Sequence, residues 1–319
     1  MKRWMVAVLI AVFAVAASPY IFIPGTITIH RSIAFNTSPN AIRRLLIENN
    51  QWNKAWIAND SNPAMKNSGQ SVFYDGNSYS LTDRKYSSIL LAIHCDKDTF
   101  ATASLDFITL SKDSVKLDWN VTMPVPSGPI RRLEVARKSR KIEADIATLL
   151  NKMESFFSKT ENVYGIHIQR ESVVDTSLLF TYDSSRGYPD MGFVYSRIAK
   201  LKNYISTQDA DITGYPMLNI YTKDSMLFLV KVALPVNKKL TSNGRMTYKW
   251  MLPHGNILVT EVKGGAKTID HAFEQMGYFM KDYGLVAPAI PFLSLVTDRM
   301  KEKDSTQWIT RIYYPVMDL

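Results

Sequence analysis

The sequence predicts an α+β protein with antiparallel sheets, organised as one membrane helix followed by two domains. Three observations predict this class. They are an apolar N-terminal segment, a series of short strands that ends in one long amphipathic helix, and a duplicated strand–helix–strand–strand pattern in the C-terminal half. The 319 residues are about twice a typical domain, and with 46% hydrophobic residues the chain can form more than one core.

Residues 1–25 form the apolar segment. Residues 4–17 are all apolar and follow Lys2 and Arg3, and a helix here would be about 30 Å long, the thickness of a bilayer core. We expect a single-pass anchor in the cell membrane, with the soluble domains on the extracytoplasmic side. The alternative is a cleaved signal peptide, because Ala14, Val15 and Ala16 resemble a cleavage site. Both interpretations predict export.

The first domain is predicted over residues 26–160. Residues 26–35 alternate as a strand does, and Ser38 and Pro39 then suit the start of a helix over 41–47. Short strands separated by turn residues follow at 71–74, 87–94, 101–110 and 115–123, which indicates an antiparallel meander. A long helix begins near Arg131 and carries apolar residues on one face, so it needs a sheet to cover.

This order of elements, together with Ser38-Pro39, the pair Trp52 and Trp56, and the aromatic strand segment 115–119, resembles the START-like SRPBCC (polyketide cyclase/dehydrase) family over about 130 residues. The resemblance implies a helix-grip fold, in which a sheet curls around the long helix and leaves a hydrophobic cavity for an apolar molecule. From the residues themselves we expect the three tryptophans to pack in the core. A basic cluster over 131–141 is expected to be a solvated helix face, with contact to anionic lipid headgroups as the alternative.

The second domain is predicted over residues 163–319 and contains an internal duplication. One unit has a strand at 166–181, a helix at 191–206 and strands at 217–221 and 227–234, and the second has the same order at 246–262, 269–283, 292–296 and 309–314. When the two units are aligned, Pro216 matches Pro291 and Pro235 matches Pro315.

The duplicated pattern, the segments 252–255, 263–265 and 271–280, and the closing segment 311–316 resemble the GyrI-like, or AraC-type, effector-binding domain. The resemblance implies two units around a pseudo-twofold axis, with a groove between them for organic ligands that are often cationic. Some members of this family carry an acidic residue on the penultimate strand that pairs with a cationic ligand, but here Asn219 and Ser294 occupy the equivalent places. A neutral ligand is therefore expected.

Candidate ligand-binding residues in this domain are aromatic or polar. They are Tyr195, Asn219, Tyr221, Trp250, Glu261, Tyr278, Ser294, Trp308 and Tyr313. Alternation along a strand places Asn219 on one face with Met217 and Tyr221. That face either lines the groove or packs on the domain's helices, and the sequence leaves both alternatives open.

Several kinds of chemistry are not indicated by the sequence. The single cysteine, Cys95, cannot form an internal disulfide, and the five histidines show no metal-ligand spacing. We therefore assign no metal, no cofactor and no catalytic residue. No helix-turn-helix segment precedes the second domain, so the expected partners are a small organic ligand and the membrane, reached through the N-terminal helix, with no nucleic acid. The sequence names no protein partner.

The leading functional hypothesis is a membrane-anchored binding protein or sensor for small apolar or amphipathic organic molecules. The alternative is a hydrolase or cyclase, in which Glu261 would act with Tyr278 or Tyr313. A third possibility is a structural or partner-binding role with filled cavities.

Overall fold

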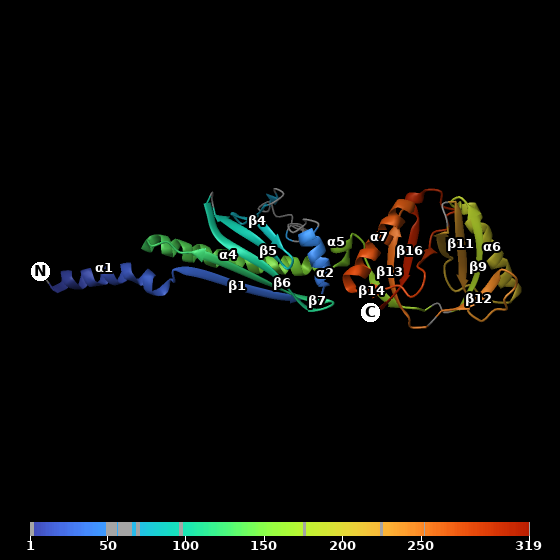
Figure 1. The fold of residues 1–319 in the computed structure, drawn as a ribbon, viewed down its shortest axis with the longest axis horizontal. Helices are drawn as coiled ribbons and strands as arrows, with labels where there is room; N and C mark the ends of the chain where they lie inside the picture. Colours follow the sequence, from blue (N-terminus) through green and yellow to red (C-terminus); the bar gives the residue numbers. More distant parts are fainter. Residues whose placement is uncertain are drawn as a thin grey trace. The chain divides into compact units, whose positions relative to one another are not determined.

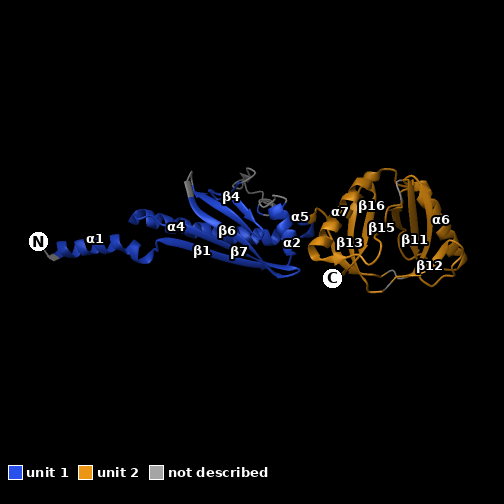
Figure 2. Ribbon diagram, viewed as in Figure 1, with its two compact units in different colours: residues 1–163 blue, residues 164–319 orange. Residues whose placement is uncertain are grey.

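The computed structural model describes residues 3–48, 56, 66–67, 71–95, 98–174, 177–223, 226–251 and 253–318. It divides into two compact units, residues 1–163 and 164–319 (Figure 2). Both units contain antiparallel sheets and helices, which confirms the α+β class (Figure 1). Trp52 and Leu252, which contribute to the two resemblances, lie outside the described residues.

The apolar segment forms one continuous helix, α1 (Arg3–Phe22). Among the described residues it is the one helix long and apolar enough to cross a membrane. Its last turn is attached to the rest of unit 1, since the Tyr20 hydroxyl donates to the carbonyl of Ser127 at 2.5 Å. The buried guanidinium of Arg132 lies 4.8 Å from the centre of the Tyr20 ring and donates to the carbonyl of Ile23 at 2.5 Å.

Unit 1 contains a seven-stranded antiparallel sheet in the order β1-β7-β6-β5-β4-β3-β2. The strands are β1 (Thr26–Phe35), β2 (Lys66–Asn67), β3 (Ser71–Tyr74), β4 (Asn77–Lys85), β5 (Ser88–Cys95), β6 (Asp98–Ser111) and β7 (Ser114–Pro124). The predicted meander is confirmed, but the sequence analysis missed β4. Only alternate residues of β4 face the core, and the many polar residues of this strand obscure the apolar–polar alternation by which a strand is predicted. Asp75 and Gly76, both with positive φ, form the tight turn that leads into it.

The helices of unit 1 follow the predicted caps. Ser38 caps α2 (Pro39–Ile42) by accepting from the amide of Asn40, and the chain continues as the π-helix η1 (Arg43–Glu48). The long helix α4 (Pro129–Phe157) buries its apolar face, with Phe157 stacked on Phe35 of β1. A short helix, α5 (Thr160–Tyr164), follows. Most of the basic residues over 131–141 are exposed, as expected, and Arg132 is the buried exception.

Aromatic rings occupy the space between the unit 1 sheet and α4. Trp56 and Trp119 are almost fully buried and stack with their ring centres 5.2 Å apart, and Tyr79 meets both edge-on. Asp145 of α4 accepts hydrogen bonds from Asn77 at 2.9 Å and from Tyr79 at 3.4 Å. Burial raises the pKa of Asp145 above its usual range. Trp56 and Trp119 thus pack in the core, as expected from their residue type.

Replacing Trp119 with alanine tests this packing. We expect the variant to lose about 3 to 5 kcal/mol of unfolding free energy, because it leaves a large cavity beside Trp56. Denaturant unfolding measures the loss, with Phe73→Ala as the control because Phe73 is 42% exposed. A loss no larger than that of the control would show that the site is loosely packed.

Unit 2 contains one eight-stranded antiparallel sheet in the order β12-β9-β11-β10-β15-β16-β13-β8. The strands are β8 (Gln169–Ser172), β9 (Ser177–Arg186), β10 (Met217–Thr222), β11 (Leu227–Pro235), β12 (Met246–Trp250), β13 (Asn256–Lys263), β15 (Phe292–Leu295) and β16 (Ile309–Pro315). The short strands β14 (Leu285–Val286) and β17 (Met317–Asp318) form a separate pair, and the short helix η2 (Ser305–Gln307) precedes β16.

The two repeats meet at the centre of this sheet. In the alignment of the repeats Leu218 corresponds to Leu293, and these two residues are paired across β10 and β15. A residue that pairs with its own counterpart lies on a twofold axis, so the pseudo-symmetry of the unit passes through this pair. On either side of it, β11 corresponds to β16 and β9 to β13.

The first strands of the two repeats are β8 and β12, and each pairs with a strand of the other repeat in the opposite half of the sheet. β8 pairs with β13 and β12 pairs with β9, which corrects the prediction of single strands over 166–181 and 246–262. From Ser172 to Ser177 the chain reaches at most about 18 Å, whereas six strand spacings of a flat sheet span about 29 Å. The sheet must therefore curve until its two halves face each other.

The two long helices of unit 2 lie on the outer sides of the curved sheet. Figure 1 shows α6 (Met191–Thr207) outside β9 and β11, and α7 (Ala266–Tyr283) outside β13 and β16. The core under α6 consists of buried aliphatic side chains: Leu179, Val194, Ile198, Leu201, Ile205, Leu218, Val230, Val232, Leu234, Val236, Leu240 and Leu295. Both long helices therefore cover the outer face of the sheet, and neither covers its inner face.

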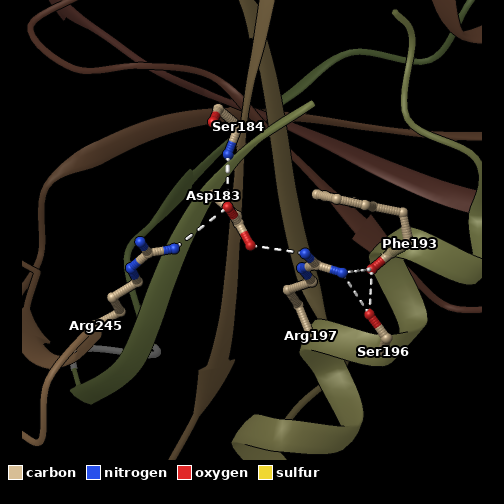
Figure 3. Close-up of polar contacts among 6 residues, drawn as sticks. All are labelled: Asp183, Ser184, Phe193, Ser196, Arg197 and Arg245. Atoms are coloured by element: carbon tan, nitrogen blue, oxygen red, sulfur yellow. Dashed lines mark hydrogen bonds and ion pairs between the residues drawn. The ribbon is translucent and has the colours of Figure 1, made fainter. Parts of the chain in front are cut away.

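A polar cluster fixes α6 to β9 (Figure 3). Asp183 of β9 accepts from Arg197 of α6 at 2.7 Å and lies 3.5 Å from Arg245. Arg197 also donates to the Ser196 hydroxyl and to the carbonyl of Phe193. The hydrogen bond from Arg197 lowers the pKa of Asp183.

The variant Asp183→Asn should weaken this attachment by about 1.5 kcal/mol at neutral pH. Because the folded pKa is lowered, the stabilisation is complete above the unfolded pKa of about 4 and is lost as the pH falls through the folded value. Hydrogen exchange of the α6 amides should therefore separate wild type from variant at pH 7 and less so below pH 4. Asp270→Asn, at an exposed position of α7, is the control. A difference independent of pH would contradict the ion pair.

Candidate functional site

The open inner face of the unit 2 sheet contains a pocket of about 270 Å³. Its lining is mostly apolar and comes from both repeats: Leu178, Phe180, Met217, Leu218, Asn219, Lys231, Val232, Ala233, Lys249, Met251, Ala289, Ile290, Phe292 and Pro315. A smaller pocket of about 100 Å³ shares Met217, Met251 and Phe292 with it and extends to Glu171 and Tyr313. The two pockets form one groove between the halves of the curved sheet.

The crossing segments run beside this groove. Val173 lies in the chain between β8 and β9, and Met251 lies between β12 and β13. Both line the smaller pocket, and the amide of Val173 donates to the carbonyl of Gly255 at 2.9 Å. The strand exchange that curves the sheet thus also supplies part of the groove wall.

The two halves of the groove differ in size because of one pair of equivalent positions. Ala233 faces Met217 in the first repeat, and its counterpart Tyr313 faces Phe292 in the second. The rings of Tyr313 and Phe292 stack with their centres 5.0 Å apart and occupy the second half. A methyl group at Ala233 leaves the corresponding volume open, which places the larger pocket in the first half.

Asn219 lies on the groove face and not on the face that packs against α6. Its side-chain amide donates to the carbonyl of Pro291 at 2.9 Å, which holds the segment that carries Ala289 and Ile290 into the pocket wall. Its side-chain oxygen, Oδ1, is buried and accepts no hydrogen bond from the part of the chain that the structure describes. Since a buried acceptor without a partner is costly, Oδ1 is suited to a donor from a bound molecule or from a neighbouring side chain.

The charges along the larger pocket are all positive. Lys231 and Lys249 line it, and no acidic residue is among its lining residues. The ammonium group of Lys249 lies 4.4 Å from the centre of the Phe180 ring. In the second repeat, Arg311 is paired with Glu261 at 2.8 Å, and this hydrogen bond raises the pKa of Arg311.

The other sequence candidates are dispersed. Ser294 is buried on the groove face, whereas Tyr221 and Glu261 lie on the same face outside the pockets and are largely exposed. Trp250 is 60% exposed at the end of β12. Tyr195, Tyr278 and Trp308 lie away from the groove.

These three aromatic residues have structural contacts of their own. The Tyr195 hydroxyl accepts from the amide of Arg299 at 2.7 Å, and burial raises its pKa. The Tyr278 hydroxyl on α7 donates to Glu274 at 3.3 Å. The indole of Trp308 donates to the carbonyl of Glu302 at 3.0 Å. Of the nine candidates, only Asn219 and Tyr313 line the groove pockets.

The sequence analysis missed most of the pocket wall. Phe180, Ala233 and Phe292 are apolar strand residues, and nothing in the sequence distinguishes their groove face from a core face. The repeat alignment does contain a signal, because Ala233 and Tyr313 differ most in volume at equivalent positions.

Of the two pairings considered for catalysis, Glu261 with Tyr278 is not assembled, whereas Glu261 and Tyr313 both interact with Arg311. Glu261 is engaged by Arg311, and Tyr278 lies on α7, which covers the opposite face of the sheet. Glu261 and Tyr278 are therefore separated by the sheet. Among the described residues, no three His, Cys, Asp or Glu side chains are grouped so that they could hold a metal ion.

No family model and no curated protein matches this chain. Among solved structures, the EcmrR C-terminal domain is similar over 48% of this chain and 99% of its own, at 14% identity and a TM-score of 0.42. The di-domain ARO/CYC BexL is similar over 91% of this chain and 85% of its own, at 8% identity and a TM-score of 0.31. Both TM-scores lie below 0.5, and neither similarity identifies a family or the START-like group in particular.

One prediction about partners is corrected by these similarities. The sequence analysis excluded nucleic acid, but an EcmrR–DNA complex is similar over 59% of this chain and 70% of its own, at 18% identity and a TM-score of 0.40. The exclusion is therefore withdrawn. The exclusion rested on the absence of a helix-turn-helix motif. Binding depends on surfaces that short motifs do not encode, so the absence of a motif does not exclude a partner.

Proposed function

We propose that this chain is a membrane-anchored binding protein for small amphipathic organic molecules, which bind in the groove of unit 2. The observation that carries the proposal is the larger pocket, a mostly apolar volume of about 270 Å³ with Asn219 Oδ1 buried in its wall. Ligand sites combine an apolar wall with a few polar groups that fix the ligand's orientation. The volume of the larger pocket suits a molecule of roughly 10 to 15 heavy atoms, which is well below the size of a typical drug.

Filling the pocket tests the proposal. The full chain is released with a non-ionic detergent and examined by native mass spectrometry, which should show a co-purified small molecule. The variant Ala233→Tyr copies the residue that occupies the second half of the groove, and we expect it to lose the adduct. Ala199→Tyr, at an exposed position of α6, is the matched control and should keep it. Wild-type protein without an adduct, or an adduct that survives in Ala233→Tyr, would contradict binding in this pocket.

Retention of α1 as an anchor is the second part of the proposal. The contacts of Tyr20 with Ser127 and of Arg132 with Ile23 support it, because they attach the end of the helix to unit 1. The first turns of α4 add apolar surface beside α1, since Ile130 is 72% exposed and Leu133 is 55% exposed. Side chains of this kind suit the membrane interface.

For the anchor we expect the protein to sediment with membranes, to resist extraction by high salt and to be released by detergent. Intact mass of the purified protein should include residues 4–22. A mature N-terminus near residues 17–20 would show instead that the segment is a cleaved signal peptide.

A further inference from the structure

We propose that the larger pocket selects an anionic amphiphile, a small molecule with an apolar body and one carboxylate, and that Lys231 is its counter-ion. This inference rests on the proposed ligand-binding function and names the chemical class of the ligand. It differs from the neutral ligand expected from the sequence, because that expectation considered only the missing acid and not the cations that remain.

The pseudo-symmetry of the unit relates Lys231 to a second cation, Arg311. In the second repeat, Arg311 of β16 is paired across the sheet with Glu261 of β13, and the two side chains form an ion pair at 2.8 Å. The equivalent pair in the first repeat is Lys231 of β11 and Tyr182 of β9. The cation is present in both repeats, but the carboxylate that neutralises it is replaced by a tyrosine in the first.

Lys231 is therefore left without a compensating charge. Among the described residues it forms no ion pair and no hydrogen bond, although its side chain is partly buried in the pocket wall. The nearby carboxylate of Asp183 lies on the opposite face of the sheet and is engaged by Arg197 and Arg245. Desolvating an ammonium group in an apolar wall is unfavourable unless an anion accompanies it.

The surroundings of Lys231 favour an anion with an apolar body. Lys249 adds a second positive charge to the same wall, and its ammonium group lies over Phe180. The remainder of the wall is apolar apart from Asn219, which is directly opposite Lys231 across β10 and β11. An ammonium group has three donors, so Lys231 can serve both Asn219 Oδ1 and a ligand carboxylate.

Three probes of one shape and different charge test the inference. They are 2-naphthoate, 2-naphthamide and 2-naphthamidine, titrated by calorimetry into the full chain in non-ionic detergent. We expect the anion to bind about tenfold more tightly than the neutral amide, as a charge-assisted hydrogen bond predicts, and the cation to bind most weakly. The preference should decrease with added salt.

Substitutions assign the preference to Lys231. Lys231→Met should lower the affinity for 2-naphthoate about tenfold and leave that for 2-naphthamide nearly unchanged, and Lys231→Glu should reverse the order in favour of 2-naphthamidine. Lys200→Met, at an exposed position of α6, is the matched control and should change neither affinity. Lys249→Met separates the contribution of the second lysine. Thermal unfolding of each variant shows whether the fold is kept.

The possible results distinguish the two proposals. Equal affinity for the three probes, preference for the amidine, or an anion preference that persists in both Lys231 variants would overturn the inference and leave the ligand-binding function standing. Failure of all three probes to bind would also overturn it. The proposed function fails separately, when the native mass spectrum shows no adduct that depends on Ala233.

Discussion

The pairing of Leu218 with Leu293 joins the two repeats of unit 2 into one sheet, and most of the unit's geometry depends on it. Because the first strand of each repeat crosses to the opposite half, the short connections force the sheet to curve. Curvature places α6 and α7 on the outer face, where each packs its buried side chains against the sheet, and leaves an inner face that neither helix covers. The groove is a consequence of this topology.

A symmetric scaffold becomes an asymmetric site through two pairs of equivalent residues. Ala233 against Tyr313 decides which half of the groove has volume, and Tyr182 against Glu261 decides which half has a cation that forms no ion pair with the described residues. Both differences favour the first half, so the open volume and Lys231 coincide. After a duplication, one repeat can keep an internal ion pair and ring stack that stabilise the sheet while the other exposes the same positions to a ligand.

The core of unit 1 differs from that of unit 2, because it contains aromatic rings and buried polar groups. Its sheet and α4 enclose aromatic rings and the buried Asp145, whose hydrogen bonds from Asn77 and Tyr79 offset part of the cost of desolvation. The resemblance to START-like proteins implies a cavity between sheet and helix, and among the described residues the buried rings of Trp56, Tyr79 and Trp119 pack against one another in this unit. A second buried polar group, Arg132, is used to attach the end of α1.

The sequence by itself determined the elements with a strong local signal. These are the apolar helix, the capped start at Ser38, the long helix α4 and the duplication, because periodicity and turn residues act over a few positions. The strand β4 was not predicted, because its many polar residues obscure the alternation of a strand. The division of the first strand of each repeat was not predicted either, because a crossover to the other half of the sheet has no local sequence pattern. Of the site, alternation allowed Asn219 to face a groove or a helix, and only the tertiary structure decided between them. Which strands become neighbours, and therefore whether a lysine lies beside a carboxylate, depends on pairing between residues 41 to 90 positions apart.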